Sequence, residues 1–171
     1  MTWVVLVVAV AGLVVGLALF EPWRAFTSSY LDESVPVAGS QAPTSAVPIT
    51  STTTAPLQPV VLSEGAFVSQ EHDTSGAARV LELPDGSRVL RLESFSTSDG
   101  PDVHVWLSDA LAGGEWHSYD DGRYVALGEI KATDGNHNYV IPADADLSGL
   151  QSVVIWCDRF NVAFGSAPLA L

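Results

Sequence analysis

Short apolar runs separated by turn residues fill the last two thirds of the chain, and they constrain its fold more than any other feature. The run "VHVWLS" places its valines and leucine on one side of an extended chain, and His104 and Trp106 on the other. After the first apolar segment, no window of helical length carries apolar residues with a period of 3.6. The pattern therefore predicts an all-β domain, an antiparallel β-sandwich or barrel of about seven or eight strands.

Two strand pairs can be located from their turns. "ARVLELPDGSRVLRLESF" contains two apolar runs around Pro84, Asp85 and Gly86, which is typical of a β-hairpin. "SVVIWC" and "FNVAF" form the last pair, with Asp158 and Arg159 between them. We expect both pairs to be neighbours in a sheet.

The N-terminal segment predicts one transmembrane helix ahead of the β domain. Thr2 to Phe20 contains no charged residue, and a helix from Trp3 to Phe20 would span about 27 Å, close to the thickness of the bilayer core. The alternative is a cleaved signal peptide, which usually has a basic start and a small-residue cleavage site soon after the apolar run. Neither is present here, so we assign residues 1–26 to an uncleaved membrane anchor and its flank.

Residues 27–60 are predicted to form a flexible linker, and residues 61–171 the β domain. The stretch from Ser40 to Pro59 is rich in Ser, Thr and Pro and has no charge, which is typical of an extended stalk outside a membrane. Arg24 favours the opposite orientation, because basic residues are retained on the cytoplasmic side. We expect a single-pass protein of the cell membrane with an extracytoplasmic domain, which protease would release by cutting between Thr27 and Pro59.

Composition excludes several functions. Seven basic and 20 acidic residues give a net charge of −13, which repels the phosphates of nucleic acid. One cysteine cannot form an intramolecular disulfide, and there is no Cys/His cluster with zinc-site spacing. The serine-hydrolase, zinc-protease and phosphate-loop motifs are also absent. The sequence therefore does not identify an enzymatic reaction.

The single cysteine, Cys157, ends the apolar run "SVVIWC". Alternation places it on the same side as Val153 and Ile155, at a strand end, where we expect a rim or a pocket mouth. Arg159 two residues later would favour the thiolate, which makes a functional thiol possible. The alternative is a packed apolar residue, because free cysteine is among the most buried residue types.

Four segments in order resemble the electron-transfer DM-thirteen domain family: "EGAF", "GPDVHVWLS", "LGEIKATDGNHNYVIP" and "SVVIWCDRFNVAFGSAPL". The resemblance covers roughly Leu62 to Leu169. It implies an extracytoplasmic β domain with a redox or electron-transfer role and a signature cysteine, here Cys157. The sequence departs from the family at His137, where glutamine is usual. It also contains no partner redox module, so the electron partner would be a separate redox protein.

The resulting site hypothesis centres on Cys157 as a redox thiol or thiolate ligand. Asp102, His104, Trp156 and Arg159 are the supporting residues, and His104 would approach the sulfur if the two strands meet. A metal or haem held by Cys157 and one histidine is chemically reasonable, but the sequence identifies no cofactor. The alternative function is a non-enzymatic cell-surface interaction module in which the cysteine is only structural.

Overall fold

Residues near the N-terminus form helix α1, Thr2–Phe20, where the uncharged segment predicted a helix. The structure is a computed structural model that describes residues 2–20, 23, 27–36 and 58–171. Within those residues, no helix combines the length and the apolar character that crossing a membrane requires. The helix is thus present, but the prediction that it spans a membrane is not supported.

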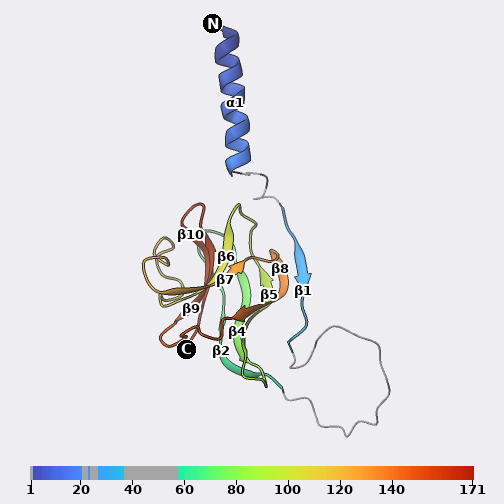
Figure 1. The fold of residues 1–171 in the computed structure, drawn as a ribbon, viewed down its shortest axis with the longest axis vertical. Coiled ribbons are helices and arrows are strands. Elements are labelled where there is room, and N and C mark those ends of the chain that lie inside the picture. Colours follow the sequence, from blue (N-terminus) through green and yellow to red (C-terminus); the bar gives the residue numbers. More distant parts are fainter. Residues whose placement is uncertain (1, 21–22, 24–26, 37–57) are drawn as a thin grey trace, which may run out of the picture.

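Ten strands among the described residues form two five-stranded sheets (Figure 1). The first sheet contains, in spatial order, β1 (Tyr30–Asp32), β8 (Asp134–Ile141), β5 (Arg88–Ser96), β4 (Ser75–Glu82) and β2 (Val60–Ala66). The second sheet contains β3 (Val68–Ser69), β10 (Val162–Pro168), β9 (Ser152–Cys157), β6 (Val103–Ser108) and β7 (Tyr124–Glu129). Side chains from both sheets share the largest buried cluster, so the all-β prediction is confirmed as a sandwich rather than a barrel.

The sandwich has more strands than the sequence predicted, and its pairing is not purely antiparallel. Strand β1 pairs in parallel with β8, and Leu31 lies opposite Gly135. Strands β1, β2 and β3 were missed because they are short or largely exposed edge strands, which carry little alternation of apolar residues. The hairpin predicted around Pro84–Gly86 is confirmed by the pairing of β4 with β5.

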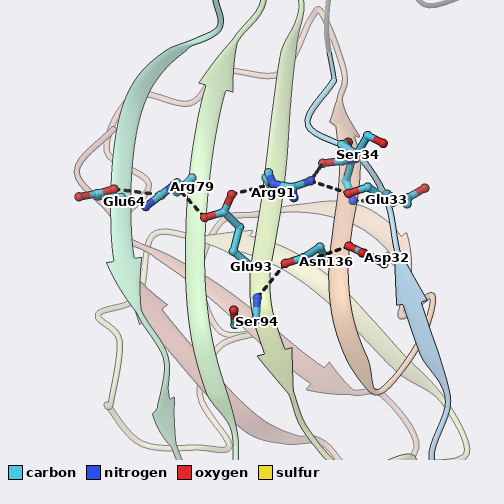
Figure 2. Close-up of polar contacts among 10 residues, drawn as sticks. Asp32, Glu33, Ser34, Glu64, Arg79, Arg91, Glu93, Ser94 and Asn136 are labelled. Atoms are coloured by element: carbon cyan, nitrogen blue, oxygen red, sulfur yellow. Dashed lines mark hydrogen bonds and ion pairs between the residues drawn. The ribbon is translucent and has the colours of Figure 1, made fainter.

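Strand β1 is held to the first sheet by half-buried and exposed polar contacts (Figure 2). The carboxylate of Glu33 accepts hydrogen bonds from the backbone nitrogen of Asn138 at 2.6 Å and from Lys131 Nζ at 3.0 Å. The buried guanidinium of Arg91 donates to the backbone oxygen of Glu33 at 3.0 Å and to Asn138 Oδ1 at 2.9 Å. The stretch from Thr27, predicted to be linker, therefore begins with residues that belong to the β domain.

The second sheet is buried on both faces around strand β9, and all six residues of β9 are buried. Its inner face packs against the first sheet, while Trp156 and Val154 on its outer face join a separate cluster with Trp106, Tyr119 and Ala163. The loop between β6 and β7 supplies Tyr119, which is 1% exposed. Burial on both faces explains why "SVVIWC" reads as a continuous apolar run.

Candidate functional site

Cys157 is the last residue of β9 and points into the core between the two sheets. It lies opposite Val103 of β6, and its exposed fraction is 0%. Its place at a strand end, on the same face as Val153 and Ile155, matches the sequence prediction. The expected rim or pocket mouth is wrong, because the thiol belongs to the main core cluster.

Burial raises the pKa of the Cys157 thiol above its ordinary value. Backbone hydrogen bonds from Phe160, Arg159 and Asp102 act in the opposite direction, while the negative charge of Asp102 raises the pKa further. The thiol is therefore protonated at neutral pH, and Arg159 does not convert it to a thiolate. Arg159 itself is exposed in the turn that follows β9.

Three polar side chains gather on the other side of the second sheet, beside Trp156. His104 Nε2 lies 2.8 Å from Asp102 Oδ1 and 3.7 Å from Asp158 Oδ2. The indole Nε1 of Trp156 donates a hydrogen bond to Asp158 Oδ1 at 2.7 Å. Strands β6 and β9 place His104 directly opposite Trp156, and the backbone nitrogen of Asp158 donates to the oxygen of Asp102. We call Asp102, His104 and Asp158 the carboxylate–histidine cluster.

The structure therefore brings three of the five predicted site residues together, and adds one that the sequence reasoning missed. Asp102, His104 and Trp156 meet, whereas Cys157 lies on the opposite face, so His104 does not approach the sulfur. The missed residue is Asp158. Alternation from Trp156 to Asp158 would have placed it on this face, but the register between β6 and β9 was needed to pair it with His104.

His137, the position at which the sequence departs from the family, belongs to the first sheet. It lies within β8 and is fully buried, because neighbouring side chains Phe95 and Tyr139 form the core around it. Its Nε2 interacts with the backbone oxygen of Asp134 at 3.1 Å, while Nδ1 has no hydrogen-bond partner among the described residues. Burial lowers the pKa of His137 below its ordinary value.

A column of aromatic rings runs from the protein surface to Trp156. Tyr124, which is 42% exposed, stacks on Trp106 with ring centroids 4.0 Å apart. Trp106 stacks in turn on Trp156 at 5.0 Å, and Trp156 precedes Cys157 in the chain. We call Tyr124, Trp106 and Trp156 the aromatic column.

A cavity of about 570 Å³ opens next to the carboxylate–histidine cluster. Asp102 is part of its wall, together with Asp99, Glu129 and Lys131. Cys157 does not line this cavity. Because its sulfur is sealed in the core, the surroundings of Cys157 do not fit a haem or a metal ion bound through the thiol.

In the comparison with protein families, the family described as Electron transfer DM13 matches residues 66–169. The curated proteins contain no match to the chain, and neither do the solved structures. The match covers Cys157, the aromatic column and the carboxylate–histidine cluster, and it confirms the resemblance seen in the four sequence segments. The chain belongs to the electron-transfer DM13 family.

Proposed function

We propose that the β domain transfers single electrons between a separate redox protein and Cys157, through the aromatic column. The column is the observation that supports this role most directly. It begins at the exposed ring of Tyr124, passes through Trp106, and ends at Trp156, which is 1% exposed and adjoins Cys157 in β9. Stacked rings bring their π-systems into contact, so an electron can leave the core although the partner never touches the thiol.

One-electron oxidation breaks the S–H bond of Cys157. The electron passes along the column to a one-electron oxidant on the partner, such as a ferric or cupric centre. The proton passes to Asp102, whose negative charge acts on this thiol. The product is a sulfur radical, which the partner returns to the thiol when electrons flow in the other direction.

Photo-oxidation of the purified protein tests this proposal. A ruthenium(III) polypyridyl complex, generated by light, serves as the oxidant, and spin trapping with electron paramagnetic resonance detects the sulfur radical. Cys157→Ser removes the signal. Tyr124→Leu, at the exposed end of the column, lowers its yield severalfold, whereas Trp116→Leu, in an exposed position outside the column, leaves the yield unchanged. Equal yields from Tyr124→Leu and the wild type would refute the proposed path.

A second candidate function has its own support. The complete burial of Cys157 and the raised pKa of its thiol favour a structural cysteine within a cell-surface interaction module. Alkylation with iodoacetamide separates the candidates together with photo-oxidation. A thiol that reacts only after unfolding, in a protein that gives no sulfur radical, rules out the redox role and supports a structural cysteine.

We also propose that residues 1–26 attach the chain to a membrane, with the β domain on the extracytoplasmic side. The support is the absence of charge from Thr2 to Phe20 and the extracytoplasmic character that the family resemblance implies. Alkaline extraction of membranes tests the attachment, because an anchored chain stays in the pellet. Recovery of the full chain in the alkaline supernatant would contradict it.

A further inference from the structure

We propose that the carboxylate–histidine cluster binds a divalent transition-metal ion, with zinc as the probe of choice. The candidate ligand atoms of Asp102, His104 and Asp158 all lie within 4.8 Å of one another. The shortest separation is 2.8 Å, between His104 Nε2 and Asp102 Oδ1. An ion bound between these atoms requires only small side-chain movements. The cluster shares Asp102 with the proton transfer proposed above, but zinc binding involves no redox reaction, so the site stands whether or not the thiol is redox-active.

The donor set selects the class of ion. One imidazole nitrogen with two carboxylates suits zinc and neighbouring transition metals, whereas calcium and magnesium prefer oxygen ligands alone. Three protein ligands also leave at least one coordination position open, as in metal sites that bind a small ligand or take part in a reaction. The class of ligand is therefore a small anion or water on the metal.

Partners outside the cluster orient its members. The indole of Trp156 holds Asp158 Oδ1 at 2.7 Å, which leaves Oδ2 turned toward His104 Nε2. Trp156 is almost completely buried, so its ring and the hydrogen bond are fixed in position. Hydrogen bonds of this kind commonly align metal ligands before the ion arrives.

Access and charge are consistent with an ion at this place. The cavity of about 570 Å³ meets the cluster at Asp102, and it is lined by two further carboxylates, Asp99 and Glu129. Lys131 is its one lysine, and it is held by the carboxylate of Glu33. With a net charge of −13 on the chain, the surroundings attract cations. The cavity gives a non-protein ligand access to the cluster from the side of Asp102.

Zinc titration of the purified full chain tests the site, with competition against a chromogenic chelator and with tryptophan fluorescence as readouts. We expect one zinc ion per chain and a fluorescence change, because Trp156 contacts a ligand. His104→Gln and Asp158→Asn should each weaken binding at least about tenfold, the loss found even for residues that only orient a ligand. Circular dichroism establishes that each variant is folded.

Two control variants locate the ion. His117→Gln changes an exposed histidine in a loop, and Cys157→Ser changes the thiol on the opposite face of the sheet. Both should bind zinc as the wild type does. The proposal is overturned if the folded His104→Gln and Asp158→Asn variants keep full affinity, if His117→Gln alone abolishes binding, or if the wild type binds no zinc.

Discussion

At the scale of single residues, His137 couples stability to pH. Its ring is fully buried, and burial lowers its pKa below the ordinary value of 6.5. As the pH falls below 6.5, the imidazole of His137 therefore binds a proton more readily in the unfolded chain than in the folded protein. The contribution of His137 to the free energy of unfolding is therefore complete above pH 6.5, and it is lost as the pH falls through the lower pKa of the folded protein.

Urea unfolding at a series of pH values measures this effect. The free energy of unfolding should fall between pH 7 and about 5.5 in the wild type. His137→Leu removes the titrating group from the core and should flatten this part of the curve, while His117→Gln, at an exposed site, should leave the slope unchanged. A slope that persists in His137→Leu would show that another group is responsible.

A second residue, Gly135, decides whether β1 can dock. Its φ is +115°, and a Cβ at this position would overlap the backbone oxygen of Leu31 in β1. Gly86 is the matched control, because its φ is +81° but a Cβ there meets nothing within 4 Å. Both alanine variants acquire backbone strain of about 1–2 kcal/mol. Gly135→Ala should lose about 1–3 kcal/mol more in urea unfolding, because it also loses backbone hydrogen bonds to β1. Equal losses in the two variants would argue against the contact.

The alternation of apolar residues predicted which side of its strand each candidate site residue occupies, but not which residues of neighbouring strands meet. Alternation along "SVVIWC" and "VHVWLS" assigned Cys157 and His104 to their faces correctly. It gave no register between the strands, and so it could not show that these two residues face opposite ways while Asp158 joins His104. The burial of Cys157 could not be predicted from the sequence either, because it depends on the first sheet packing over the cysteine.

At the level of secondary-structure elements, the short edge strand β1 is held in place mainly by polar contacts. It has three residues, and its register with β8 joins positions about a hundred residues apart in sequence, such as Leu31 and Gly135. No apolar alternation marks such a strand, so the sequence assigned it to a linker. The contacts that hold it are polar, and they centre on Glu33.

Glu33→Ala should therefore weaken the docking of β1. The variant loses the bonds from Asn138 and Lys131, worth about 1–3 kcal/mol together for a charged acceptor. Glu64→Ala is the control, since its ion pair with Arg79 is solvent-exposed and such pairs contribute about 0–1 kcal/mol. Hydrogen exchange should speed up along β8 in Glu33→Ala alone. Similar exchange of β8 in both variants would contradict a docking role for Glu33.

At the scale of the whole molecule, the Ser/Thr/Pro segment has a different place from the one the sequence suggested. Strands β1 and β2 lie at opposite edges of the first sheet, and the segment from Ser40 to Pro59 connects them in sequence. The chain thus leaves the sheet after β1 and returns to it at β2. The residues between helix α1 and the sheet are the short stretch from Glu21 to Ser29, so the Ser/Thr/Pro segment is not the spacer between them.

Because of this connectivity, cleavage within the Ser/Thr/Pro segment should not by itself release the β domain from the N-terminal helix. We expect a single cut between Ser45 and Ala46, at an introduced protease site, to leave the two fragments associated, because β1 stays paired with β8 and Glu33 stays bound to Lys131. Size-exclusion chromatography in mild detergent should show both fragments in one peak, and urea should separate them. The same cut in Gly135→Ala should release the N-terminal fragment without urea, since β1 cannot dock there. If the wild-type fragments separate under native conditions, the Ser/Thr/Pro segment acts as the linker that its composition suggested, and cleavage alone releases the domain.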